Sequence, residues 1–150
     1  MRVYLVIMDE SEEARTAMRF ASRRAAKTGG AVHILALVPK QDFVAFGGVQ
    51  ATIEEEARDR AEVLANSAAG SLLSESGQMP VIAVREGEGH AVIRDYLAEH
   101  GEVAALVLGS AAEGGPGPLV SYFSTHSGTL PCPVFIVPGG LNDEDIDRLS

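Results

Sequence analysis

The sequence predicts a single α/β domain built on a doubly wound, five-stranded parallel sheet with helices on both faces. Short runs rich in β-branched residues, each suited to a strand buried on both faces, alternate with segments of helical periodicity. The chain has 150 residues, which suits one domain with one core. Because neither an internal repeat nor a linker is visible, we expect no second folding unit.

The first half of the chain predicts two strands, each followed by a helix. Residues 3–8 (VYLVIM) and 31–38 (AVHILALV) are apolar runs of strand length. Ser11 is a suitable N-cap for the first helix, and Thr52 opens the second helix with capping-box spacing. The intervening segment 41–51 lacks periodicity, so we expect a loop there.

The second half predicts three further strands and two helices. The expected strands cover residues 80–84, 103–108 and 134–137, and the expected helices cover residues 91–100 and 118–130. We expect residues 1–140 to form the α/β domain. Residues 141–150 are expected to form a flexible tail, because they are acidic and follow a Gly-Gly pair.

Composition excludes several classes of partner. The net charge of −9 and a pI near 4.8 argue against binding to nucleic acid or to an anionic membrane. No apolar run approaches the roughly 18 residues of a membrane span, and the chain opens on a strand-like segment instead of a signal peptide. We therefore expect a soluble, cytoplasmic protein. Cys132, between two prolines, is expected to be a packed thiol without a catalytic role.

In a doubly wound sheet, ligands bind beyond the carboxyl ends of the strands. The residues expected there are Asp9, Val38, Lys40, Arg85 and the segment from Gly109 onward. The fourth expected strand leads through several glycines into a helix start. Exposed backbone N–H groups and the helix dipole favour an anion at such a place, so the segment is a candidate phosphate site.

Other chemistries find little support. Ser121, Ser124 and His126 share one short segment without an orienting carboxylate, so we expect no catalytic site and no enzyme. His33 is expected to be a packed histidine, because no cysteine or second histidine lies at ligand spacing, and we expect no metal site. A response-regulator receiver would need an aspartate after the third strand, and a flavodoxin would not place acidic residues after the first strand.

Three pieces of the sequence together resemble the universal stress protein family, and the resemblance covers nearly the whole chain. They are Asp9 with Ser11, Gly109 with Ser110, and the ending LPCPVFIVP at 130–138. The resemblance implies an adenine-nucleotide α-hydrolase-like, Rossmann-like fold, with the third strand at one edge and a crevice between strands one and four. It also implies a homodimer through the fifth strand, whose apolar edge invites pairing. The dimer contacts expected there are Val134, Phe135, Ile136 and Val137.

Members of that family that bind ATP carry Gly-x2-Gly-x9-Gly-(Ser/Thr) after the fourth strand. Here Gly109 matches the first glycine, Ala112 replaces the second, and Val120 precedes Ser121 where the final Gly-(Ser/Thr) pair is expected. The loop is also two residues short. A β-branched valine obstructs close approach of phosphate to the backbone, so we expect weak binding of the triphosphate.

Two functions remain open at this stage. By resemblance, ATP or another adenine nucleotide would be held by Asp9, Val38, Gly109, Ser110 and Ser121. The glycines at 114, 115 and 117 would have to rebuild a shorter phosphate loop. The alternative is a stress protein without a nucleotide or other cofactor, acting as a dimeric interaction module.

Overall fold

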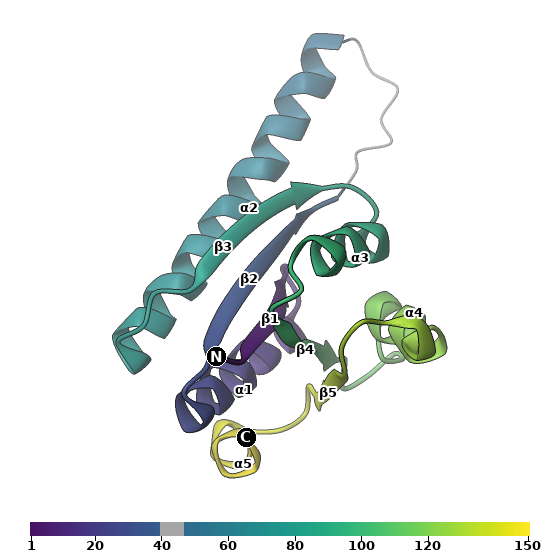
Figure 1. Cartoon of the computed structure of the whole chain (residues 1–150). Coiled ribbons are helices and arrows are strands. Elements are labelled where there is room, and N and C mark those ends of the chain that lie inside the picture. Colours follow the sequence, from purple (N-terminus) through teal and green to yellow (C-terminus); the bar gives the residue numbers. More distant parts are fainter. Residues whose placement is uncertain (40–46) are drawn as a thin grey trace.

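A computed structural model describes residues 1–39 and 47–150, and Figure 1 shows how the elements are arranged. The elements, in chain order, are β1 (Val3–Met8), α1 (Glu12–Thr28), β2 (Ala31–Val38), α2 (Gly47–Ser76), β3 (Val81–Glu86), α3 (Gly89–Glu99), β4 (Val103–Ser110), α4 (Pro118–Thr125), the 3-10 turn η1 (Ser127–Thr129), β5 (Val134–Pro138) and α5 (Asp143–Leu149). Strands and helices alternate as the sequence predicts.

The five strands form one parallel sheet in the order β3-β2-β1-β4-β5. This confirms the predicted fold class, including the position of the third strand at an edge. The chain winds from β1 outward to β3 and then returns to the other side of β1 with β4. The strand order therefore reverses between β1 and β4, and in folds of this kind ligands bind at that reversal.

Both faces of the sheet are buried, because β1 sends alternate side chains into two separate clusters. Tyr4 and Val6 pack with α1 and α2, whereas Leu5 and Ile7 pack with α3 and α4. All six residues of β1 are at most 6% exposed, as expected for a central strand covered on both sides. The helix layers on the two faces are visible in Figure 1.

Each end of α1 is fixed by a local capping interaction that its own sequence provides. The Ser11 side chain accepts a hydrogen bond from the Ala14 N–H at 3.3 Å, as an N-cap does. Gly29 ends the helix in the left-handed region with φ of 66°, and its N–H bonds to the Ala25 carbonyl. Both ends are thus fixed by local chemistry.

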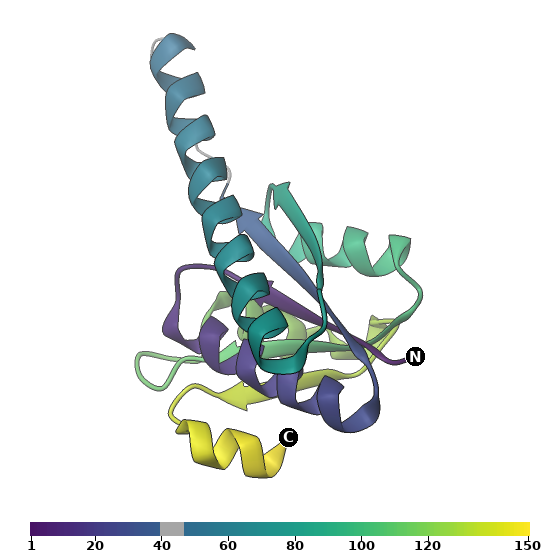
Figure 2. The ribbon, with the colours of Figure 1, turned by 90° about the vertical axis from the view of Figure 1, so that its left-hand side faces the viewer.

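Helix α2 differs from the prediction, because it begins at Gly47 and not at Thr52. In a continuous helix the N–H groups near Thr52 bond within the helix, so the capping-box residues are not needed as a cap. Part of the loop expected at 41–51 is therefore helical, and its residues 41–46, like Lys40, lie outside the described residues. Figure 2 shows the first turns of α2 extending beyond the sheet. No helix within residues 1–39 and 47–150, α2 included, is both long and apolar enough to cross a membrane.

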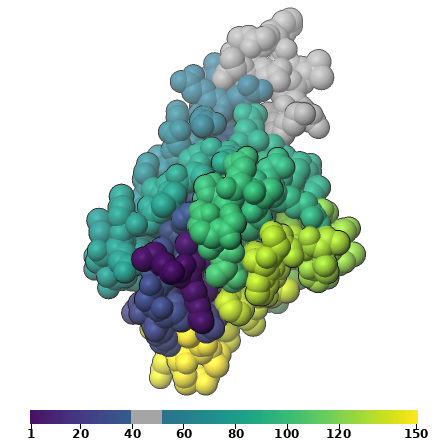
Figure 3. Space-filling view, viewed as in Figure 1, coloured from purple at the N-terminus to yellow at the C-terminus, as the bar shows by residue number. Residues whose placement is uncertain are grey.

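The C-terminal segment also differs from the expected flexible tail, because residues 143–149 form α5, packed against α1. Ile146 is 1% exposed, and Arg19 donates two hydrogen bonds to the Asp147 carboxylate, at 2.9 and 2.8 Å. These hydrogen bonds lower the pKa of Asp147. Asn142 accepts a hydrogen bond from the Asp145 N–H and caps the helix. Two of the acidic residues that suggested disorder, Asp143 and Asp147, thus pair with Arg19 of α1, and Figure 3 shows the C-terminal residues lying against that helix.

Candidate functional site

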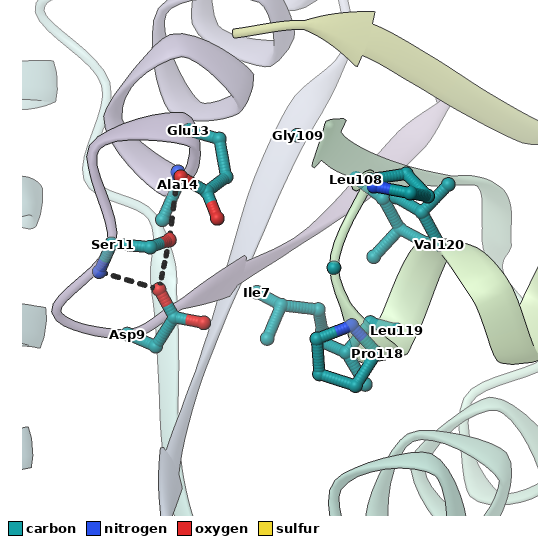
Figure 4. Close-up of a pocket in the computed structure, with 12 residues that line it drawn as sticks. Ile7, Asp9, Ser11, Glu13, Ala14, Leu108, Gly109, Pro118, Leu119 and Val120 are labelled. Atoms are coloured by element: carbon teal, nitrogen blue, oxygen red, sulfur yellow. Dashed lines mark hydrogen bonds between the residues drawn. The ribbon is translucent and has the colours of Figure 1, made fainter. Parts of the chain in front are cut away.

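The structure has a small cavity where the strand order reverses, between the carboxyl ends of β1 and β4 and the first turns of α1 and α4 (Figure 4). Its lining residues are Ile7, Asp9, Ser11, Glu13, Ala14, Leu108, Gly109, Pro116, Gly117, Pro118, Leu119 and Val120. The cavity volume is about 60 Å³. Ligand pockets usually enclose about 300–1,000 Å³, so a nucleotide would enter only if this site opened.

Asp9 forms one wall of the cavity. Both hydrogen bonds described for its carboxylate reach Oδ1, one from the Ser11 N–H at 2.9 Å and a short one from the Ser11 hydroxyl. Ser11 in turn caps α1, so Asp9 supports the cap without being the cap itself. Figure 4 shows the second oxygen of Asp9 turned toward the space in front of Pro118. That oxygen is placed to accept a hydrogen bond from a ligand hydroxyl.

Gly109 has a steric role that the sequence did not indicate. A Cβ at this position would lie 2.0 Å from the carbonyl oxygen of Glu13 and 2.5 Å from its carbonyl carbon. Both are backbone atoms, which cannot rotate away. Glycine is therefore needed for the end of β4 to approach the first turn of α1, with or without a ligand.

The opposite wall is the end of the glycine loop and the start of α4. Gly114, Gly115 and Gly117 all have positive φ, between 76° and 100°, and the Ala111 N–H closes the loop by bonding to the Pro116 carbonyl at 3.2 Å. Pro118 is at the first helical position and, like Pro116, has no N–H to offer. The N–H donors at this wall are thus fewer than in a loop of glycines.

Charge at the cavity is negative. Asp9 and Glu13 contribute carboxylates, and none of its lining residues is a cation. Arg85, expected near the strand ends, is instead held by Glu99 at 2.9 Å and lies over the ring of Tyr96. The electrostatic field of the lining side chains therefore opposes a highly charged ligand, and the attraction for an anion comes from the N-terminal ends of α1 and α4, whose first turns line the cavity.

The five residues expected to bind a cofactor divide into two groups. Asp9 and Gly109 line the cavity, whereas Val38, Ser110 and Ser121 do not. Val38 is 1% exposed, and its carbonyl already accepts a hydrogen bond from the Gly87 N–H at 3.2 Å. Ser121 is exposed on the first turn of α4.

Of the apolar residues that narrow the site, the sequence singled out Val120 but not Leu119 or Pro118. Leu119 and Val120 line the cavity, and Val120 is also 6% exposed within the core below α4. Pro118 at the start of a helix is a recognised signal and could have indicated where the α4 wall begins. The core contact of Val120 explains why a valine is accommodated where the family pattern has glycine.

His33 and Cys132, which the sequence analysis considered as a metal ligand and as a catalytic thiol, lie away from the cavity. His33 is 7% exposed and its Nδ1 lies 2.7 Å from the Tyr96 hydroxyl, which confirms the expected packed histidine with a partnered nitrogen. Burial lowers the pKa of its imidazole. Burial also raises the pKa of the Cys132 thiol, which therefore remains protonated and weakly nucleophilic near neutral pH.

A doubly wound parallel sheet with a cavity at its strand-order reversal defines the class of α/β domains that carry their ligands at that point. The family model of the universal stress protein family matches residues 1–138. The chain therefore belongs to the universal stress protein family. A comparison with curated proteins finds no match.

Solved structures of that family share the fold. Universal stress protein UspA from Lactobacillus plantarum matches with a TM-score of 0.77 and 22% identity, covering 91% of this chain and 97% of that chain. The universal stress protein from Archaeoglobus fulgidus in complex with dAMP matches with a TM-score of 0.57 and 20% identity, covering 91% and 97%. A family protein from Arabidopsis thaliana with AMP bound matches with a TM-score of 0.62 and 14% identity, covering 97% and 95%.

Proposed function

We propose that the protein is a cytoplasmic universal stress protein that binds an adenine nucleotide weakly, without enzymatic action, and that it does not favour ATP over AMP. The observation that carries this proposal is the composition of the cavity. It combines the free oxygen of Asp9 with the N-terminus of α4, and its lining includes two carboxylates and no cation.

The relatives support adenine nucleotides as the ligand class. The structures from Archaeoglobus fulgidus and Arabidopsis thaliana are described with dAMP and AMP, which each carry a single phosphate. In this chain Asp9 would accept a hydrogen bond from a ribose hydroxyl, and the adenine would lie toward the carboxyl end of β2 at Val38, whose carbonyl is already bonded to the Gly87 N–H. The phosphate would lie at the start of α4, close to the hydroxyl of Ser121 and to Ser110.

The site must open to admit a nucleotide, and the glycine loop offers the means. A Cβ on Gly114, Gly115 or Gly117 would meet no atom within 4 Å, so the loop is not packed against the body of the domain at these points. Movement of this loop would enlarge the 60 Å³ cavity without disturbing the sheet. Opening costs free energy, which is a further reason to expect weak binding.

Replacing Asp9 tests the assignment of the site. The Asp9→Asn variant keeps an oxygen for Ser11 and removes the charge, so a charge-assisted hydrogen bond to the ligand becomes a neutral one. We expect AMP affinity to fall by about 3- to 30-fold, since hydrogen bonds to charged groups contribute about 1.5–3 kcal/mol and neutral ones about 1 kcal/mol.

Glu113→Gln is the matched control, because it removes the same charge from an exposed loop position outside the cavity lining. Its AMP affinity should stay within about twofold of the native value, because exposed charges are screened by salt. Removal of a negative charge by itself favours an anionic ligand, so AMP binding by Asp9→Asn that is unchanged or tighter would refute the proposed hydrogen bond.

A dimeric interaction module is the second candidate, supported by the small cavity and by the edge of β5. Ile136 is 44% exposed there, whereas Phe135 packs on Phe20 at 5.7 Å between ring centroids. Ile136→Lys is therefore the sharper test of a homodimer, because it alters the edge without removing a core contact. Sedimentation should show a dimer that this variant dissociates and that Val63→Lys, at a 67% exposed position on α2, leaves intact. A native monomer would refute the dimer.

A further inference from the structure

Two histidines and a glutamate meet at the end of the sheet opposite to the cavity. His33 is the third residue of β2, His100 follows α3 directly, and Glu102 precedes β4. A ring nitrogen of each histidine and a carboxylate oxygen of the glutamate all lie within 4.8 Å of one another. The amino ends of β2 and β4, together with the end of α3, thus bring together residues that are far apart in the sequence.

His33 is held rigidly on the sheet. It is 7% exposed, and its Nδ1 lies 2.7 Å from the hydroxyl of Tyr96, a residue of α3 that is 1% exposed. A metal-binding histidine characteristically has its second ring nitrogen fixed by an oxygen in this way, which orients the ring. With Nδ1 engaged, Nε2 is the atom available as a ligand.

His100 and Glu102 form the outer side of the group. The His100 ring stacks on Tyr96, with centroids 4.0 Å apart and planes at 20°, and it lies edge-on to His33 at 5.8 Å. Its Nδ1 is 3.0 Å from the Glu102 Oε1. The Glu102 side chain is 50% exposed, so the group is open to solvent on one side.

The donor set points to one class of ligand. Two imidazoles and a carboxylate suit Zn²⁺ and related first-row divalent ions, whereas Mg²⁺ and Ca²⁺ prefer sites made of oxygen. We propose that His33, His100 and Glu102 bind a divalent transition-metal ion such as Zn²⁺, with water completing the coordination on the exposed side. Each ligand would approach to roughly 2.0–2.2 Å from the ion.

Formation of the site requires only a local adjustment. Ligand atoms now up to 4.8 Å apart would need to come to roughly 3.3 Å in a tetrahedral arrangement. The exposed turn that carries His100 and Glu102 can supply this movement, because His33 is fixed by the strand. Binding would tie the end of α3 to β2 and β4, and would do so independently of the nucleotide cavity.

The test is calorimetric titration of Zn²⁺ into the full chain, prepared without a histidine tag and dialysed against chelator. We expect one ion per chain with a Kd of about 1 μM or tighter, no binding of Mg²⁺ in the same range, and visible absorption bands when Co²⁺ replaces Zn²⁺. A hundredfold excess of Zn²⁺ over Kd should raise Tm by roughly 5–10 °C.

Two single substitutions distinguish specific metal binding at this group from nonspecific binding to surface histidines. His100→Gln should weaken Zn²⁺ binding by more than about tenfold and abolish the metal-dependent rise in Tm. His126→Gln, which removes an exposed histidine that follows α4 and lies outside the group, should change neither. No binding at about 100 μM Zn²⁺, or equal loss in both variants, would overturn the proposal.

Discussion

Gly109→Ala should destabilise the fold strongly, although it adds one methyl group. The new Cβ would lie 2.0 Å from the Glu13 carbonyl oxygen, where ordinary contacts are 3.4 Å or more. Relief requires the end of β4 and the first turn of α1 to separate by more than about 1 Å. Overpacking of this kind costs about 1–3 kcal/mol and occasionally more. We expect about 3 kcal/mol here, because the opposing atoms are backbone.

Urea denaturation and thermal melting followed by circular dichroism measure the effect. At roughly 2–4 °C per kcal/mol for a chain of this size, Tm should fall by about 6–12 °C. Gly101→Ala is the matched control, because its Cβ would meet no atom within 4 Å and its φ is not positive. The control should change the free energy of unfolding by less than about 1 kcal/mol. Equal stability of the two variants would refute the steric role of Gly109.

Two further predictions concern α5. Ile146→Ala should lower the free energy of unfolding by about 2–5 kcal/mol in urea titrations, because Ile146 is 1% exposed, whereas Leu149→Ala, at a 52% exposed position, should change it by under about 0.5 kcal/mol. An Ile146→Ala variant with the same free energy of unfolding as the native protein would show that α5 is not packed against the domain in solution. The pKa of Asp147 is lowered in the folded state, so its contribution to stability is present above its unfolded pKa near 3.8 and is lost as the pH falls through the lower, folded value. Native protein should therefore lose stability more steeply than Asp147→Asn between pH 5 and pH 2, and parallel pH profiles would contradict the Arg19–Asp147 pairing.

The sheet could be predicted from the sequence because a strand buried on both faces must be apolar at nearly every position. The run at residues 31–38 shows this, with His33 as its one polar residue, accommodated by Tyr96. The N-cap Ser11 could be predicted equally well, because its chemistry involves residues within one turn.

The features that could not be predicted depend on contacts between distant residues. Arg19 and Asp147 are 128 positions apart, so their pairing could not be predicted and the acidic C-terminal segment was interpreted as a solvated tail. The segment has one fully buried side chain, Ile146, and a single apolar position gives no helical periodicity. His33 and His100 are likewise brought together only by the packing of α3 on the sheet. The sequence predicted Gly109 as the first glycine of the family's phosphate-binding pattern. Its close approach to the backbone of Glu13 depends on the packing of β4 against α1 and could not be predicted.

The most direct test of the proposed function is calorimetric titration of the native protein with adenosine, AMP and ATP at physiological salt. The cavity lining, with Asp9, Glu13 and no cation, predicts Kd values of about tens of micromolar or weaker for ATP and no more than about threefold difference between ATP and AMP. Sub-micromolar binding of ATP, or binding of ATP more than about tenfold tighter than that of AMP, would contradict this account and would show that the loop of Gly114, Gly115 and Gly117 forms a working triphosphate site.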